Sequence, residues 1–369
     1  MSDEIPSSIS VNHYKCINCG ADLTYAPGTT TLTCEYCGTE MAIADAGSAA
    51  QVEEADFTKF LSENNISDEQ KCVVHTINCG SCGAITTLDE HVTSGECAFC
   101  GTPLVVANAQ TSTIIKPKYL LPFKIVQKDA LNAYKQWIRK LWFAPNKLKK
   151  YGTTADKLSG VYIPYWTYDA QTETDYRGER GTNHTETYAV TVNGKRETRT
   201  RTVVHWRAVS GHVSEFFDDV LILASTSLPR KYTEKLEPWD LENLVEFNEQ
   251  YLSGFRSESY QVNLVDGFTA AKSVMDIRIR GLIGHDIGGD HQRINWLATN
   301  HSNIMFKHIL LPVWISAYRF NNKVYRFMIN GRTGEVQGER PWSWLKITLA
   351  SLSASAAIGV IYYFWKMYS

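Results

Sequence analysis

Four Cys-x-x-Cys-Gly segments in the first 101 residues constrain this chain of 369 residues more than any other feature. They form two quartets with the same spacing, C-x2-C-x14-C-x2-C. The cysteines are Cys16, Cys19, Cys34 and Cys37 in the first quartet, and Cys79, Cys82, Cys97 and Cys100 in the second. Two such pairs at the tips of two hairpins supply four thiolates to one Zn2+ ion, and the glycine lets the backbone curl back toward the sulfurs. The spacing predicts two closed, structural zinc ribbons, with a rubredoxin-like iron site or paired disulfides as alternatives.

The charge of this N-terminal part argues against nucleic-acid binding by the ribbons. Residues 1–110 contain three lysines and no arginine against fifteen Asp and Glu residues, a net charge of −12, while the rest of the chain carries +10. Affinity for nucleic acid is largely phosphate neutralisation by Lys and Arg. We therefore expect the ribbons either to dock a protein partner or simply to cap the fold.

The C-terminus reads as a membrane span. Residues 347–365 carry no charge, and as a helix rising about 1.5 Å per residue they span roughly 28 Å, close to the hydrocarbon thickness of a bilayer. Aromatic and basic residues flank this run on both sides, as in an interfacial belt. The prediction is a single C-terminal anchor in contact with lipid; a buried helix of a soluble protein is the alternative.

Basic residues are more frequent before the span than after it, which places the large domain in the cytoplasm. Those before it are Lys323, Arg326, Arg332, Arg340 and Lys346, against Lys366 beyond. Free thiolates also require a reducing compartment. Within the span, Ser351, Ser355 and Gly359 recur every four residues and predict a face for close contact with another helix.

The middle of the chain predicts an α+β core with much antiparallel sheet. We expect helices at 125–141, 241–252 and 268–279, and a hairpin over 185–208 around Asn193-Gly194, a dipeptide that favours a type I′ turn. Further strands are expected at 292–299, 304–311, 313–320 and 324–329. The predicted organisation is ribbon 1 at 1–44, a linker at 45–70, ribbon 2 at 71–110, the core at 111–341 and the anchor at 342–369.

Catalytic signatures are missing from the sequence. It contains no G-x-x-x-x-G-K-[ST], no G-x-S-x-G and no H-E-x-x-H, so we expect no enzyme. His285, Asp286, Asp290 and His291 surround a Gly-Gly pair, which indicates either a metal or proton-transfer site or, more commonly, a polar turn. The ninth cysteine, Cys72, sits in an apolar stretch and is expected to be a buried thiol.

With its ribbons, its Pro164-Tyr165-Trp166-Thr167 segment and the Asn330-Gly331-Arg332-Thr333-Gly334-Glu335-Val336 segment before the anchor, the chain resembles a family of bacterial membrane-anchored zinc-ribbon proteins. Such sequences are often labelled TFIIB-type zinc ribbon or primosomal protein N′ (replication factor Y), a PriA-like helicase. The resemblance implies the bacterial inner membrane and an adaptor similar to subunits that accompany phage-shock-type and SPFH membrane-remodelling proteins. Because every motor motif is missing, it does not bring helicase or ATPase activity.

Three functions follow as hypotheses. The first is a tail-anchored, cytoplasm-facing adaptor that docks cytosolic or membrane protein partners at the membrane. The second is a nucleic-acid-associated zinc-ribbon factor of the replication type, which would have to bind through the basic remainder of the chain. A third, weaker one is an enzyme centred on the His285–His291 segment.

Overall fold

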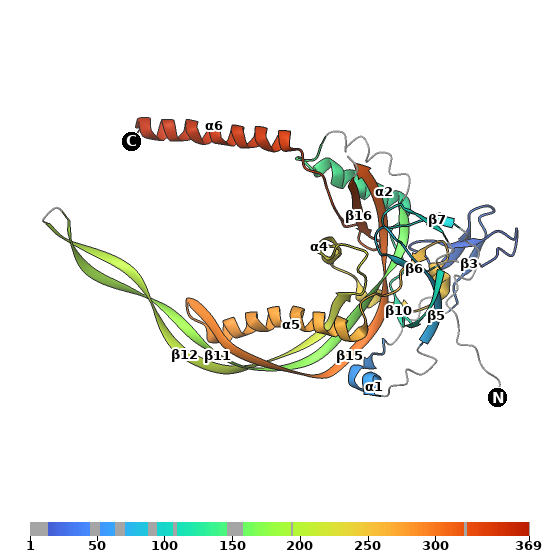
Figure 1. The fold of residues 1–369 in the computed structure, drawn as a ribbon, viewed down its shortest axis with the longest axis horizontal. Coiled ribbons are helices and arrows are strands. Elements are labelled where there is room, and N and C mark those ends of the chain that lie inside the picture. Colours follow the sequence, from blue (N-terminus) through green and yellow to red (C-terminus); the bar gives the residue numbers. More distant parts are fainter. Residues whose placement is uncertain are drawn as a thin grey trace.

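The structure is a computed structural model that describes residues 14–44, 52–62, 71–87, 94–105, 109–145, 158–192, 195–320 and 323–368. The molecule consists of a head, a long arm of strands and a C-terminal helix. The arm and the helix both project from the head (Figure 1). The fold is mixed α/β with antiparallel sheets, two N-terminal clusters of four cysteines and one apolar C-terminal helix, which confirms the coarse fold class expected from the sequence.

The arm is built from three very long strands. β11 (Ser159–Val192), β12 (Lys195–Leu223) and β15 (His291–Phe320) lie side by side, with β11 in the middle and both neighbours antiparallel to it. The predicted hairpin is confirmed in its strands, since Val192 pairs with Lys195, while the Asn193-Gly194 turn lies outside the described residues.

β15 joins three segments that the sequence separated into different strands. Asn303 has φ 49°, and the register against β11 shifts between Asp169 and Gln171. A β-bulge therefore absorbs the extra residues that suggested a break, and the ladder continues across it.

The helices agree in part with expectation. α2 (Gln127–Lys140) lies where it was predicted, and α5 (Leu264–Ile287) extends the predicted helix at both ends, from the Asn263 cap to Gly288 at φ 64°. The helix expected at 241–252 is wrong. There the chain forms the 3-10 turns η5 (Leu241–Asn243) and η6 (Glu249–Leu252) around β13 (Val245–Glu246), which pairs with β10, so sheet pairing overrides helical propensity.

The remaining elements are short, except for the C-terminal helix. The head contains β1 (Leu23–Tyr25), β2 (Thr31–Cys34), β3 (Glu40–Ala42), β4 (Ala55–Asp56), α1 (Phe57–Ser62), β5 (Lys71–Asn78), β6 (Ile85–Thr87), β7 (Ser94–Glu96), β8 (Pro103–Val105), β9 (Ala109–Ile115) and β10 (Tyr119–Leu120). Between β12 and β15 lie α4 (Arg230–Thr233), η4 (Glu234–Leu236) and β14 (Arg256–Ser257), and β15 is followed by β16 (Lys323–Asn330), β17 (Val336–Gly338) and α6 (Trp344–Tyr368).

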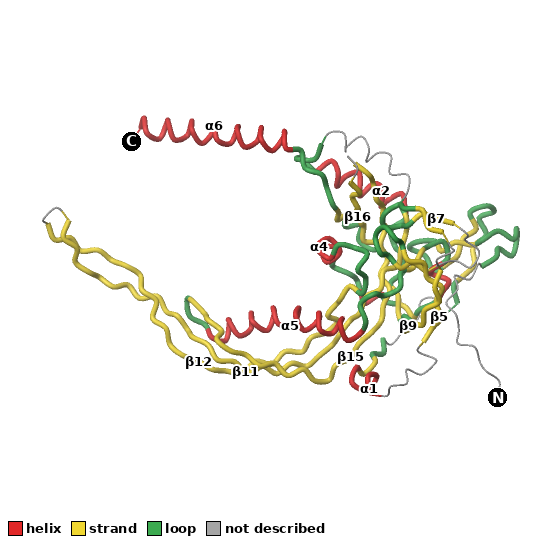
Figure 2. Tube along the Cα trace, in the orientation of Figure 1, coloured by secondary structure: helices red, strands yellow, loops and turns green. Residues whose placement is uncertain are grey.

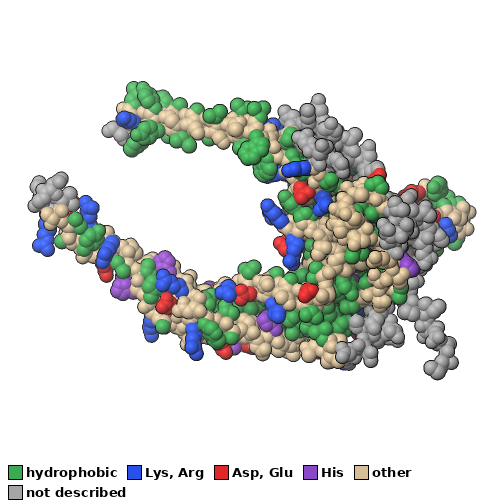
Figure 3. Space-filling model, in the orientation of Figure 1, with side chains coloured by type: hydrophobic (Ala, Val, Ile, Leu, Met, Phe, Trp, Pro, Cys, Tyr) green, Lys and Arg blue, Asp and Glu red, His purple; other side chains and the backbone are tan. Residues whose placement is uncertain are grey.

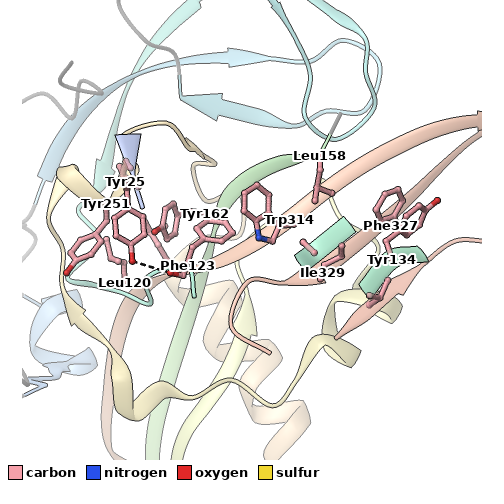
Figure 4. Packing of buried hydrophobic residues seen from close by; sticks show 14 of the residues in the cluster. Tyr25, Leu120, Phe123, Tyr134, Leu158, Tyr162, Tyr251, Trp314, Phe327 and Ile329 are labelled. Carbon is pink, nitrogen blue, oxygen red and sulfur yellow. Dashed lines mark hydrogen bonds between the residues drawn. The ribbon is translucent and has the colours of Figure 1, made fainter. Parts of the chain in front are cut away.

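The two cysteine clusters lie on opposite faces of the same sheet. Alternate residues of a strand point to opposite faces, and Tyr162 of β11 belongs to one hydrophobic cluster while Val161 and Ile163 belong to another. The hydrophobic cluster that contains Tyr162 joins the first cysteine quartet to α2 and to aromatic residues of the sheet (Figure 4). The second joins Phe99 and its neighbouring cysteines to the other face. The segments that carry the two cysteine quartets are thus both part of the packed head.

α5 lies along the concave side of the arm and makes a third cluster with it (Figure 2). The closest approach is at Gly267, where an added Cβ would overlap the hydroxyl of Tyr168, which donates to the Leu264 carbonyl at 2.6 Å. Gly281, on the same helix, has open space around it.

Gly267→Ala should therefore destabilise the protein by about 1–3 kcal/mol, because the buried Tyr168 ring must move. Gly281→Ala is the matched control, and it should stabilise the helix by about 0.5–1 kcal/mol because alanine has the higher helix propensity. Chemical denaturation of the two variants beside the parent measures both changes. Equal effects at the two positions would contradict this description of α5 packing.

Candidate metal centres and candidate membrane helix

All four Cys-x-x-Cys-Gly segments have the same backbone conformation. In each, the glycine has φ between 70° and 77° and donates its N–H to the carbonyl of the first cysteine at 2.8–3.0 Å. The N–H of the first cysteine donates to the carbonyl two positions beyond the second cysteine, at 2.7–2.9 Å. A positive φ is costly for residues other than glycine, which explains why glycine follows every pair.

The sulfur atoms of each quartet are gathered tightly enough for one metal ion. All four ligand atoms lie within 4.8 Å of one another in both clusters. The shortest Sγ–Sγ separations are 3.5 Å, for Cys16–Cys37 and Cys19–Cys34, and 3.5 and 3.6 Å in the second quartet. Sulfurs bound to one zinc ion at about 2.3 Å stand about 3.8 Å apart, whereas disulfide sulfurs stand about 2.05 Å apart. The geometry fits two tetrathiolate metal sites and does not fit disulfides.

A threonine after each second cysteine pair favours the thiolate form. The Sγ atoms of Cys37 and Cys100 lie 3.1 Å from the Oγ1 atoms of Thr39 and Thr102. Hydrogen bonds from Thr39 lower the pKa of Cys37 to about 6. Burial opposes ionisation of Cys100, but its side-chain and backbone hydrogen bonds with Thr102 lower its pKa to about 7. Thiolates are the species that bind metal, so Cys37 and Cys100 are ready ligands, whereas burial raises the pKa of Cys79 in the second quartet.

The two sites differ in how far they reach into solvent. At the first, Cys19 and Cys37 are exposed, and the intervening side chains Ile17 and Tyr36 are 83% and 84% exposed. At the second, Cys79, Cys97 and Cys100 are buried, and Phe99 is fully buried against the sheet. The first site therefore ends in an exposed tip formed by Ile17 and Tyr36, and the second is mostly buried in the head, with Cys82 partly exposed.

α6 is the one helix in the described part of the chain that is long and apolar enough to cross a membrane, judged by length and composition alone. None of its 25 residues is buried, and its hydrophobic side chains face solvent along its length (Figure 3). Ser351, Ser355 and Gly359 lie within α6 and are exposed, as are all residues of the helix from 351 to 368.

The segment from His285 to His291 forms the turn between α5 and β15. The Asp286 carboxylate accepts from the Tyr176 hydroxyl at 2.5 Å, and Asp290 accepts from the Asn183 N–H at 2.7 Å. His291 hydrogen-bonds the Asn183 side chain at 3.0 Å, so these polar groups fasten the turn to the arm. Among the described residues, the three groups with metal-ligating geometry do not include this segment. Cys72 is fully buried, and burial raises its pKa to about 12.

Sequence reasoning missed a third group, which is acidic and lies beside the bulge of the arm. It comprises Glu54, Asp169, Asp218 and Asp219. The ammonium of Lys307, 4% exposed, lies 2.5 Å from Glu54 and 2.6 Å from Asp219. Burial would lower the pKa of Lys307, but hydrogen bonds to Asp219 and Glu54 raise it. Lys307 thus supplies the positive charge within this acidic group. Its carboxylate partners come from segments far apart in the chain, so no local sequence pattern predicts the group.

Comparisons with known proteins identify one similar chain. The "Uncharacterized protein YdjG" of Bacillus subtilis (strain 168) is 27% identical over 345 residues, which cover 90% of this chain and 91% of that protein. No protein-family model and no solved structure matches. The match extends over nearly the whole of both chains, and the name of the relative states no activity, substrate or partner.

Proposed function

We propose that this protein is an adaptor that α6 anchors in the bacterial inner membrane, with a cytoplasmic head that holds two structural Zn2+ ions and docks a protein partner. When bound, zinc would cross-link Cys16, Cys19, Cys34 and Cys37 in one site and Cys79, Cys82, Cys97 and Cys100 in the other. Four protein thiolates complete each coordination sphere, so the metal supplies stability and no open position for chemistry.

The exposure of α6, none of whose residues is buried, supports the membrane part of this proposal. A 25-residue helix that buries none of its side chains in the protein leaves a large apolar surface that water does not stabilise. A lipid bilayer would cover it. The excess of basic residues before the helix favours a cytoplasmic head. Ser351, Ser355 and Gly359 would then offer a face to another membrane helix.

Insertion would require a change in the relative direction of α6 and the arm. Figure 1 shows both leaving the head and running the same way. A bilayer around α6 in this arrangement would also enclose part of the arm, which exposes charged side chains such as Arg177 and Arg293. Charges in hydrocarbon cost several kcal/mol each, so the two projections must diverge when the helix inserts.

The observation that carries the adaptor function is the exposed tip of the first site. Ile17 and Tyr36 project from two turns that a metal ion would hold rigid, and Glu35 and Glu40 beside them are also exposed. An aromatic and an aliphatic side chain on a rigid support, bordered by charge, are the features of a protein-binding hot spot. The resemblance noted in the sequence points to membrane-remodelling proteins as the partner class.

Replacing Ile17 and Tyr36 by serine should reduce recovery of the partner from detergent-solubilised membranes at least tenfold, because hot-spot side chains each contribute about 2 kcal/mol or more. Metal content and melting temperature should stay unchanged, since both side chains are in solvent. Tyr188→Ser with Phe216→Ser on the arm is the matched control, because these side chains are also exposed. Equal partner recovery from all three proteins would rule out the tip as the docking surface.

A nucleic-acid-associated role is the alternative, and the arm offers one observation in its favour. The guanidinium of Arg293 lies 3.8 Å from the Trp206 ring centroid, and that of Arg177 lies 5.5 Å from Trp296. Arginine–aromatic pairs occur in single-strand binding surfaces. However, Arg201 and Arg293 are also paired with carboxylates, at 3.0 and 3.6 Å. This role requires a binding constant that falls steeply with salt in a mobility-shift assay.

A further inference from the structure

A hollow of about 440 Å³ lies where α6 joins the head. Its walls come from β16, through Lys323 and Tyr325, from the segment between β17 and α6, through Arg340 and Trp342, and from Trp344, the first residue of α6. Figure 3 shows Lys and Arg side chains near this junction, at the end of the apolar surface of α6. None of the predicted site residues belongs to it.

The side chains that line the hollow carry positive charge that is free to bind an anion. Among the described residues, no carboxylate lines the hollow, and neither Lys323 nor Arg340 has an ion pair with Asp or Glu. Arg340 instead lies over the Trp342 ring, 4.3 Å from its centroid. A stacked guanidinium keeps its N–H groups free to donate to an anion, and its fork matches two oxygens of one phosphate.

The surroundings of the hollow are those of a membrane surface. Trp342 and Trp344 are 51% and 76% exposed, and the nearby Trp142 is 82% exposed. Trp142 is held at this level because the Lys346 ammonium donates to its carbonyl at 3.3 Å and to the Ala144 carbonyl at 2.8 Å. Exposed tryptophans at one end of an apolar helix, together with basic side chains, are typical of the headgroup region.

We propose that this hollow binds the phosphate of an anionic phospholipid, with Arg340 and Lys323 on the phosphate oxygens and Trp342 and Trp344 against the glycerol and upper acyl chains. The inference rests on the proposed insertion of α6. A free phosphate shares the same chemistry, but it would leave the tryptophan rings uncovered. A lipid covers them, and its acyl chains continue along the apolar side chains of α6.

The test uses the full chain, purified in a mild detergent, with native mass spectrometry during titration with phosphatidylglycerol or phosphatidylcholine. Phosphatidylglycerol should bind with preference to one site. Lys323→Gln with Arg340→Gln should weaken that binding roughly 30-fold, because each basic residue near an anionic surface contributes about a factor of five to ten. Arg196→Gln with Arg199→Gln at the end of the arm removes the same charge and should leave the binding unchanged.

Lys323 is exposed, so Lys323→Gln alone cannot unfold the head and should still weaken phosphatidylglycerol binding about fivefold. Equal binding of the two lipids, or equal loss in the arm variant, overturns the proposal. Displacement of the lipid by millimolar inorganic phosphate would also overturn it, in favour of a soluble phosphate ligand. Carbonate-resistant insertion into vesicles of phosphatidylcholine alone tests α6 separately, so failure of this site and failure of the anchor can be told apart.

Discussion

Cys34→Ser should lower the metal content of the purified protein from two equivalents to one and unfold the first cysteine module. Removing one thiolate leaves an incomplete tetrahedron, and structural zinc sites contribute on the order of 10 kcal/mol to the folding of their modules. Cys34 is also buried in the cluster that contains Leu32, Tyr25 and Phe123. The loss should therefore extend beyond the module to that face of the head.

Cys97→Ser should have the larger effect on global stability. Three of the four cysteines of its quartet are buried, and its neighbour Phe99 packs against the sheet beside Tyr119 and Val161. For the same reason a chelator should remove metal from the first site, with its two exposed cysteines, before the second. Elemental analysis and thermal unfolding of the variants measure both effects.

Cys72→Ser is the control for these variants, because Cys72 is a fully buried cysteine that belongs to neither quartet. It should retain two equivalents of metal and lose only about 1–3 kcal/mol, the cost of burying a hydroxyl in place of a thiol. Metal loss in Cys72→Ser equal to that in Cys34→Ser would contradict the assignment of the sites. So would a wild-type protein that contains disulfides instead of metal.

Deleting residues 344–369 should move the protein from the membrane fraction to the soluble fraction. Each Leu, Ile, Phe or Val at the centre of a membrane helix favours insertion by about 0.3–0.6 kcal/mol, and α6 contains many such residues. No residue of α6 is buried, and the helix contacts the head through the two Lys346 hydrogen bonds to the Trp142 and Ala144 carbonyls. The shortened protein should therefore keep its metal content and show only a small change in melting temperature. Carbonate extraction followed by immunoblotting measures the change.

Gly359→Arg provides a milder version of this test, because an arginine near the middle of the helix costs about 2.5–3.5 kcal/mol. Gly359→Leu is its matched control and should insert as well as the parent, since nothing in the structure lies near this glycine. If the deleted and full-length proteins fractionate alike, α6 is not an anchor and the exposed helix needs a protein partner to cover it.

Much of the candidate metal chemistry could be read from the sequence, because ligand type, spacing and the following glycine are all local properties. The difference in exposure between the two sites could not be predicted from the sequence. Tyr36 and Phe99 occupy the same position within their Cys-x-x-Cys-Gly segments, yet Tyr36 is 84% exposed and Phe99 is fully buried. Packing against β11 buries the segment that contains Phe99 and leaves the one that contains Tyr36 exposed to solvent. This packing joins residues that are far apart in the chain.

The same reason explains the errors in the fold. The residues around Asn303 have the composition of a turn, but pairing with β11 on one side carries the strand across them as a bulge. Residues 241–252 have helical spacing, but pairing between β13 and β10 divides them. α2 and α5 were predictable because a hydrophobic period of 3.6 residues is present in the local sequence.

The central claim is that a membrane-anchored head docks a protein partner through the tip at Ile17 and Tyr36. The most direct measurement is affinity purification of the full chain from nuclease-treated native membranes, beside the Ile17→Ser/Tyr36→Ser variant, with the recovered proteins quantified by mass spectrometry. We predict that a membrane-associated protein is recovered stoichiometrically with the parent and is lost with the variant, while the metal content stays at two equivalents. Recovery that is the same with both proteins, or that occurs only when nuclease is omitted, would contradict it.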